Sequence, residues 1–233
     1  MTRGVDLELV RAIRADLAAA ANNSRATAMR AYMKSSMPYR GVPSPGQQAI
    51  YRRHVTAARR LDFDTWMATC LELWRKAEYR EERYAALALA GHPQYREYQV
   101  PRTLPMYDEM ITDGAWWDYV DAVAIHLVGG MLRRHRVEVE SLLVPWRTDA
   151  SMWRRRSSII AQVASKTNTD TAFLVASIEP NLGDREFFIR KAIGWALRAY
   201  AWVDPDWVRG YVVENTARLS GLSRREALKN IGA

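Results

Sequence analysis

The sequence predicts an all-α protein, a HEAT-like helical-repeat solenoid (an α–α superhelix), on three observations. Apolar residues recur at intervals of three and four, and the alternating pattern of a β-strand is almost absent. Proline and glycine separate the periodic segments. An aspartate followed four residues later by an aromatic residue recurs at Asp113, Asp149 and Asp184, at intervals of 36 and 35 residues. Two-helix repeats of this length are typical of HEAT and armadillo arrays.

The same patterns place each helix along the chain. Breakers such as Pro38-Tyr-Arg-Gly-Val-Pro-Ser-Pro45, Gly91-His-Pro93 and Glu179-Pro-Asn-Leu-Gly183 separate them. We expect a single domain over residues 1–233, with about 1–24 and 220–233 at its periphery. The predicted helices are 6–20, 23–36, 46–60, 64–76, 79–91, 103–112, 115–131, 135–146, 150–165, 169–178, 184–201, 205–219 and 223–230.

The repeat predicts which side chains share the concave face, because one helix of every pair lines that face. We interpret Asp113, Asp149 and Asp184 as helix N-caps. Counted from these caps, Asp121 lies at +8, and Arg156 and Lys191 lie at +7, with Trp195 one turn further. The register therefore predicts that these four side chains line one basic groove, although a slip of one residue rotates a side chain by about 100°.

The charge of the chain favours a polyanionic partner. Lys+Arg total 34 against 26 Asp+Glu, for a net charge of +8, and only five of the basic residues are lysine. Arginine binds phosphate in a bidentate manner, which makes nucleic acid the first candidate. Genomic base composition also produces an arginine excess, so the charge alone does not define a groove.

Membrane and disulfide classes are disfavoured. Cys70 is the only cysteine, which excludes an intrachain disulfide and a cysteine-ligated metal site, and we expect it to be buried. The most apolar segments, 85–91 and 122–132, are too short or too interrupted to span a bilayer. No stretch has the order of a signal peptide. We expect a soluble, cytoplasmic protein.

The segment Trp116-Trp-Asp-Tyr-Val-Asp121 is the best candidate for a chemical site. Trp117 and Asp121 are four residues apart, so they project from one helical face. A carboxylate beside an indole, in a basic protein, fits a site for a cation or a cationic transition state. The plainer interpretation of Asp121, and on composition alone the more frequent one, is a partner for an arginine in the helix stack.

The other candidates carry plain interpretations too. Of Arg154-Arg-Arg156, we assign Arg156 to the groove as a phosphate contact and the other two to the rim or solvent. Gly194 inside a helix indicates a close approach to its backbone. Trp195 next to it fits core packing at least as well as a groove position. We assign Trp66, Trp74, Trp153 and Trp202 to packing between helices.

No rival catalytic motif is present. His54, His92, His126 and His135 lack metal-ligand spacing, and there is no Walker loop, dinucleotide fingerprint or nucleophile elbow. We therefore expect no metal and no organic cofactor.

Several segments together resemble one family. They are Ala31-Tyr-Met-Lys34 with Gly41-Val-Pro-Ser-Pro45, Trp116-Trp-Asp-Tyr-Val-Asp121, Trp153-Arg-Arg-Arg156, and Arg190-Lys-Ala-Ile-Gly-Trp195-Ala-Leu-Arg-Ala-Tyr200. Between about residues 25 and 217 the chain resembles the AlkD-like DNA alkylation repair family, bacterial DNA glycosylases built from HEAT-like repeats. The resemblance implies that Asp121 is the catalytic carboxylate, with Trp117 and Trp195 as its indole neighbours. It also implies that Arg156 holds the DNA backbone and that Tyr32 lies near the lesion.

The activity that the resemblance implies is base excision from alkylated double-stranded DNA. The enzyme would hydrolyse the N-glycosidic bond of cationic N3- or N7-alkylated purines. We add Lys34, Arg155 and Lys191 as further DNA contacts. No lysine adjoins Asp121 in the sequence, so we expect a monofunctional glycosylase, acting as a monomer. The alternative is a non-catalytic binder of damaged DNA or a protein-interaction scaffold, because helical solenoids are most often binding scaffolds.

Overall fold

The computed structural model describes residues 4–232, which fold entirely as helices and turns without a β-strand. The all-α prediction is confirmed, and every predicted helix has a counterpart. The chain forms two compact units, with the boundary between Tyr98 and Gln99. Across residues 4–232, no helix combines the length and apolar character needed to cross a bilayer.

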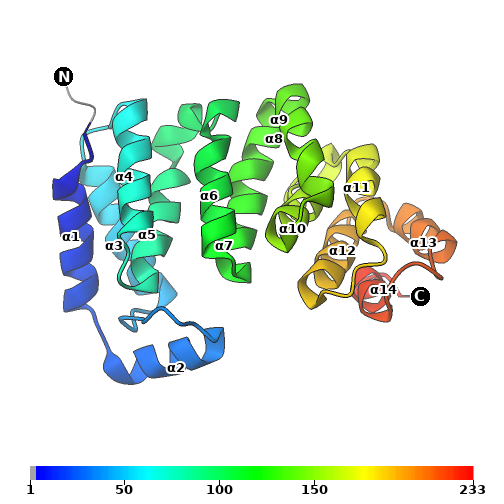
Figure 1. Ribbon diagram of the computed structural model, residues 1–233, viewed down its shortest axis with the longest axis horizontal. Helices are drawn as coiled ribbons and strands as arrows, with labels where there is room; N and C mark the ends of the chain where they lie inside the picture. The colour runs from blue at the N-terminus through cyan, green and yellow to red at the C-terminus, as the bar shows by residue number, and fades with distance from the viewer. Residues whose placement is uncertain (1–3, 233) are drawn as a thin grey trace. The chain divides into compact units, whose positions relative to one another are not determined.

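The first unit is a helical bundle in which α1, α3, α4 and α5 pack against one another (Figure 1). Its elements are α1 (Leu7–Ala19), α2 (Asn23–Met33), α3 (Ser44–Ala57), α4 (Phe63–Arg75), α5 (Arg80–Ala90) and the 3₁₀ turns η1 (Pro93–Tyr98). Helix α1 buries Leu9, Val10, Ile13 and Leu17. Helix α2 runs crosswise to its neighbours and buries only Met33 (Figure 1).

A buried carboxylate fixes the loop between α2 and α3. Glu81, fully buried at the start of α5, accepts the backbone N–H groups of Arg40, Gly41 and Val42 at 3.0, 2.9 and 3.3 Å. Gly41 has a φ of +82°, and a Cβ there would lie 2.1 Å from the carbonyl oxygen of Asn22. Only glycine fits this backbone position, which explains the glycine of the Gly41–Pro45 segment.

The second unit holds the candidate site. Its elements in chain order are η2 (Pro101–Thr103), α6 (Leu104–Gly114), α7 (Trp117–Ala122), η3 (Val123–Val128), α8 (Gly129–Arg134), α9 (Arg136–Leu143), η4 (Val144–Thr148), α10 (Met152–Ile160), η5 (Lys166–Asn168), α11 (Thr171–Ile178), η6 (Glu179–Asn181), α12 (Phe187–Tyr200), α13 (Pro205–Glu214) and α14 (Gly221–Leu228). One hydrophobic core links η3 and α10 through α14. Each fully buried aliphatic side chain in it contributes about 1.5–3 kcal/mol.

The repeat is confirmed, but its helix caps differ from the prediction. Helices α7, α10 and α12 begin 35 residues apart. Asp113 lies inside α6, while Asp149 and Asp184 accept the N–H groups of Ser151 and Glu186, each at 2.8 Å. These aspartates therefore close turns before the helices, and the N-cap prediction is wrong. Aspartate bonds a backbone group two residues on as readily as it caps a helix, so spacing alone could not separate the two.

The helix that carries Asp121 changes from α-helical to π-helical geometry two residues after it. The predicted helix 115–131 is a continuous helical segment from Trp117 to Arg134, with a π-helical turn, η3, between α7 and α8. At the end of this turn a Cβ on Gly129 would lie 2.2 Å from the carbonyl oxygen of Ala161. Such π turns recur at functional sites.

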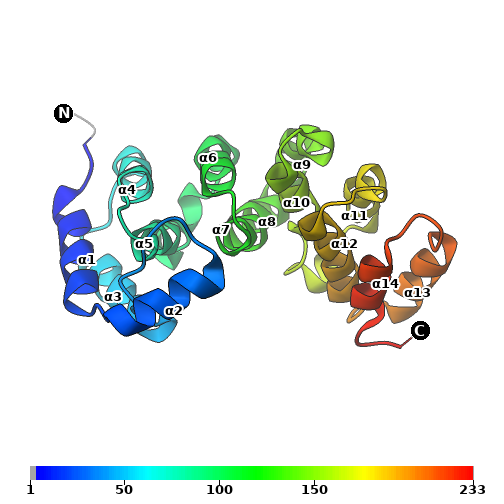
Figure 2. The ribbon, with the colours of Figure 1, turned by 60° about the horizontal axis from the view of Figure 1, so that its bottom comes forward.

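Gly194 marks the closest approach of α12 and α14, as the sequence indicated. A Cβ on Gly194 would lie 2.5 Å from the Cβ of Glu226 and 2.7 Å from the carbonyl oxygen of Ser223. The two helices lie side by side in both views (Figures 1 and 2). The C-terminal helix, expected at the periphery, thus contributes to the core through Ala227.

We expect Gly194→Ala to lower the free energy of unfolding by about 1–3 kcal/mol, because α14 must move away to make room for the methyl group. Gly210→Ala is the matched control: Gly210 is also helical, and a Cβ there meets nothing within 4 Å. That change should leave stability equal or raise it by up to about 1 kcal/mol. Urea denaturation of both variants checks this, and equal stabilities would contradict it.

Candidate active site

The structure brings Asp121 and Arg156 into direct contact. Arg156 donates from Nε to Oδ1 of Asp121 at 2.7 Å and from Nη2 to Oδ2 at 2.8 Å. Its Nη1 donates to the carbonyl oxygen of Phe188 at 2.6 Å. This is a bidentate, charge-assisted pair, which fixes the plane of the carboxylate as well as its position. The Arg156 side chain is 4% exposed and that of Asp121 is 14% exposed.

The repeat explains why these two residues meet. Asp121, Arg156 and Lys191 are 35 residues apart and each occupies the fifth position of its helix, in α7, α10 and α12. The offset between +8 and +7 in the sequence register arises because the segment between Asp113 and α7 is one residue longer. Equivalent positions of stacked repeats adjoin. Asp121 therefore reaches Arg156, and Lys191 reaches Glu226, another 35 residues on, at 2.6 Å.

This pairing changes how Arg156 is understood. We expected its guanidinium at the DNA backbone, but three of its nitrogen atoms bond within the protein. The plainer interpretation of Asp121, a partner for an arginine of the helix stack, describes the observed contact. Contact between Arg156 and DNA stays a prediction.

The neighbouring arginines are ion-paired within the protein, and their places at the rim, with Arg155 as a DNA contact, stay predictions. Arg154 grips Asp108 of α6 in the same bidentate manner, with both bonds at 2.7 Å, and also pairs with Asp149 at 3.2 Å. Arg155 pairs with Asp184 at 3.0 Å. The arginine triplet therefore ties α10 to α6, to α7, to α12 and to the turn at Asp184. The sequence could not show this, because apart from Asp149 the partners lie 29 to 46 residues away.

An aromatic cluster that sequence reasoning did not single out packs beside the pair. Ring centroids of Trp116, Trp153 and Phe188 lie 5.1–6.4 Å apart. The Arg156 guanidinium carbon lies 5.9 Å from the Phe188 ring centroid. Trp116 Nε1 is buried and makes no hydrogen bond within residues 4–232. The signal was Trp116, the first indole of the Trp116-Trp117 pair, to which the sequence analysis assigns no role.

The other candidate residues of the second unit are Trp117, Trp195 and Lys191. Trp117 begins α7 and is half-buried. Trp195 is half-buried against the core of the second unit. Lys191 shares the carboxylate of Glu226 with Arg198, which pairs with it at 2.7 Å. The bond from Lys191 is the main cause that lowers the pKa of Glu226.

Two candidates belong to the first unit. Tyr32, near the end of α2, is 79% exposed. Lys34 is exposed and ends α2 in the left-handed conformation, with a φ of 49°.

The packing assignments of Trp66, Trp74 and Trp153 are confirmed, since all three are buried. The assignment of Trp202 is wrong, because it is 76% exposed: it follows the last residues of α12, in a turn.

The electrostatics of Asp121 suit a group that works at the edge of solvent. Burial raises the pKa of Asp121 above its ordinary 3.8, while the hydrogen bonds and charge of Arg156 act to lower it, and nearby Asp118 raises it. Burial thus deprives the ionised carboxylate of water molecules that would stabilise its charge. A nearby cation can stabilise that charge instead. Across the described residues, no three His, Cys, Asp or Glu side chains gather in a way that could hold a metal ion.

Comparison with known proteins agrees with these observations. A model of the family described as DNA alkylation repair enzyme matches residues 13–231. A solved structure, a predicted DNA alkylation repair enzyme from Enterococcus faecalis, is 28% identical, with a TM-score of 0.82 over 91% of this chain and 96% of that chain. No functionally curated protein matches significantly. The chain belongs to the AlkD-like family of DNA alkylation repair enzymes and has its HEAT-like repeat fold.

Proposed function

We propose that this protein is a monofunctional DNA glycosylase that hydrolyses the N-glycosidic bond of cationic N3- or N7-alkylated purines in double-stranded DNA. The observation that carries the proposal is the Asp121 carboxylate, immobilised by Arg156 and still 14% exposed. Membership of a DNA alkylation repair family supports the choice of substrate class.

The chemistry needs little beyond a well-placed carboxylate. A purine alkylated at N3 or N7 carries a positive charge and departs as a neutral base when the bond to C1′ breaks. The sugar then becomes oxocarbenium-like, as in glycoside hydrolysis. Asp121 stabilises this charge electrostatically, and it accepts a proton from the water that attacks C1′. The products are the free base and an abasic site.

Arg156 acts in this scheme as a positioning residue. A carboxylate offers about four lone-pair sites, and the bidentate bond uses one on each oxygen. One site on each oxygen is therefore left for the sugar cation and for water. The third bond of Arg156, to the carbonyl oxygen of Phe188, anchors the guanidinium to α12.

The second candidate is a non-catalytic binder of damaged DNA. The ion pair itself favours this candidate, because Asp121 has a structural partner and needs no catalytic role to account for its presence. Membership of a family described as DNA alkylation repair enzyme favours catalysis. Incubation with alkylated duplex separates them: a glycosylase yields free base and abasic sites, whereas a binder yields a complex and intact DNA.

We expect base release to have an acidic limb that belongs to Asp121. The ionised carboxylate is the active form, and burial raises its pKa above 3.8, so the rate should fall as the pH drops through that raised value. Single-turnover rates between about pH 4 and 8, corrected for uncatalysed depurination, measure the limb. A rate that is flat down to pH 4 would contradict a role for this carboxylate.

We expect no covalent intermediate on a lysine. A Schiff base needs a free amine beside the sugar, and Lys191, the candidate lysine of the second unit, is bonded through Nζ to Glu226. Borohydride added during turnover should trap no protein–DNA adduct, with a bifunctional glycosylase as positive control. A trapped adduct would overturn the monofunctional assignment.

A further inference from the structure

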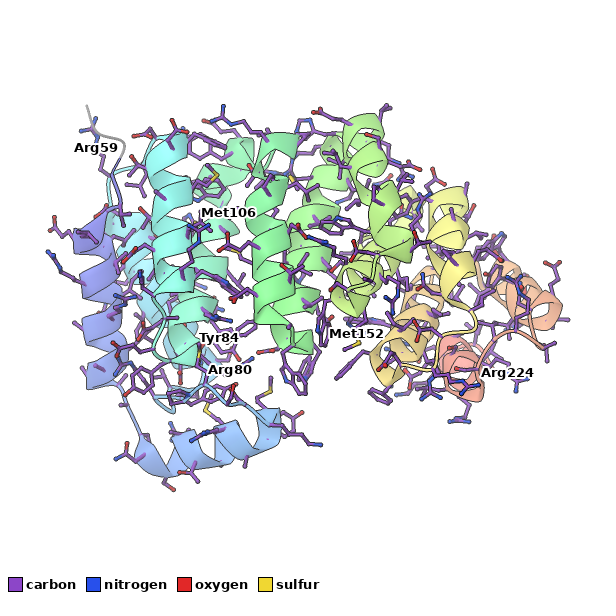
Figure 3. The ribbon with its side chains drawn as sticks, viewed as in Figure 1. Arg59, Arg80, Tyr84, Met106, Met152 and Arg224 are labelled. Carbon is purple, nitrogen blue, oxygen red and sulfur yellow. The ribbon has the colours of Figure 1, made fainter. Side chains whose placement is uncertain are left out.

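A second, chemically distinct groove lies between α13 and α14, near the C-terminus. It encloses about 570 Å³, within the range of sites that hold small molecules and short peptide segments. Figure 3 shows Arg224 on α14 at this end of the protein. The groove is lined by Arg209, Val212, Val213, Thr216, Gly221, Arg224, Arg225, Leu228 and Lys229.

The helical periodicity explains how the groove forms. On α13 the lining positions 209, 212 and 213 fall on one face, at the i, i+3 and i+4 spacing, and Thr216 follows in the turn after the helix. On α14, Ser223 and Ala227 are buried, and Gly194 of α12 meets this side of the helix. The other side of α14, with Arg224 and Leu228 four residues apart, is left for the groove.

The floor of this groove is apolar and open. Val213 is 72% exposed, although Tyr211, Val212 and Asn215 beside it are buried. Val212 and Leu228 complete the apolar lining. Exposed apolar surface enclosed by polar residues is typical of an interaction site.

The rim is cationic and largely unneutralised. Arg209 is engaged by Asp206 at 2.7 Å and by the carbonyl oxygen of Ile231 at 2.6 Å. Within residues 4–232, by contrast, no carboxylate lies within ion-pair distance of Arg224, Arg225 or Lys229. None of the groove-lining side chains is an Asp or Glu. Lys229 lies close enough to Glu226 for its charge to lower the pKa of that carboxyl, which leaves Arg224 and Arg225 as the cations that attract an anionic partner.

We propose that this groove binds an acidic peptide segment of a partner protein, with one or two apolar side chains seated on Val212, Val213 and Leu228. Arginine clusters recognise acidic motifs, and an apolar floor gives such a motif its anchor. A DNA backbone satisfies the cations but offers nothing to the valine and leucine floor. The groove shares no residue with the Asp121 site, so a bound segment leaves that site's residues untouched.

The test uses the full-length protein and two fluorescein-labelled peptides, Asp-Asp-Leu-Asp-Asp-Phe and Asp-Asp-Ser-Asp-Asp-Ser, followed by fluorescence anisotropy. We expect the apolar peptide to bind at least about tenfold more tightly than the serine peptide. Combined Arg224→Glu and Arg225→Glu substitutions should weaken it by about tenfold or more, and Val213→Ser should weaken it several-fold. Matched controls at exposed positions outside the groove, Arg185→Glu and Val137→Ser, should bind it as the wild type does.

The outcomes separate this proposal from its rivals. Equal binding of the two peptides, or no loss in the Arg224/Arg225 variant, overturns it. If that variant binds undamaged duplex DNA more weakly while peptide binding is negligible, the rim is a DNA contact and the proposal is wrong. Base release by the variant should equal the wild-type rate, so failure of the proposed glycosylase activity appears separately, in the wild-type protein.

Discussion

Asp121→Asn should lower the rate of base release by about 10²–10⁴-fold, while the affinity for alkylated duplex DNA is kept or increased. The substitution removes the negative charge that stabilises the sugar cation and the base that receives a proton from water. It also removes a charge that repels phosphate. Single-turnover excision from a duplex with one 7-methylguanine, alongside DNA binding by the same sample, measures both effects.

The control for Asp121→Asn is Asp108→Asn. Asp108 is gripped by Arg154 with the same two-bond geometry, at 2.7 Å for both bonds, on the same arginine triplet. The Asp108→Asn variant should lose part of the stability that this ion pair contributes and keep the full rate of base release. Comparable losses of activity in both variants would mean that the second unit, rather than the Asp121 carboxylate, is sensitive to breaking such pairs. Circular dichroism at the assay temperature confirms that both variants are folded.

Arg156→Ala should lower the free energy of unfolding by about 3–5 kcal/mol, because it leaves Asp121 largely buried without its partner. It should also move the acidic limb of base release to higher pH, since the hydrogen bonds and charge of Arg156 act to lower the pKa of Asp121. Arg156→Lys keeps the positive charge but cannot make the bidentate bond. Its acidic limb should therefore lie between those of the wild type and Arg156→Ala. Urea denaturation and pH–rate profiles supply the two readouts.

Arg154→Ala is the matched control for Arg156→Ala. The Arg154 side chain is 32% exposed, so its loss should cost no more than about 1 kcal/mol and leave the acidic limb in place. If instead Arg156→Ala leaves stability and the limb unchanged and weakens DNA binding with a reduced salt slope, Arg156 is a phosphate contact. The positioning role would then be wrong.

The sequence was enough to predict the helices and the spacing of the repeat. Periodicity in apolar residues placed each helix, because burial of one face governs helical patterns. Asp121, Arg156 and Lys191 share a position in successive repeats, which the spacing of the aspartates indicated to within one residue. Gly194 indicated a close approach to the backbone of α12, because glycine inside a helix costs stability relative to alanine.

The sequence could not show which side chains bond across the repeats. Whether Arg154, Arg155 or Arg156 points to a given neighbour depends on rotations of about 100° per residue and on loop lengths between helices. The distance along the chain from Asp113 to the first residue of α7 is one residue longer than the equivalent distances from Asp149 and Asp184, which shifted the register. The exposure of Trp202 and the π turn η3 likewise depend on tertiary packing.

The most direct test of the account is the product analysis of dimethylsulfate-treated duplex DNA after incubation with the wild-type protein. Chromatography of the released material should reveal free 3-methyladenine and 7-methylguanine, with matching abasic sites in the DNA and none of this with Asp121→Asn. If the wild-type protein binds the alkylated duplex and releases no base, it is a binder of damaged DNA and the Asp121–Arg156 pair is structural.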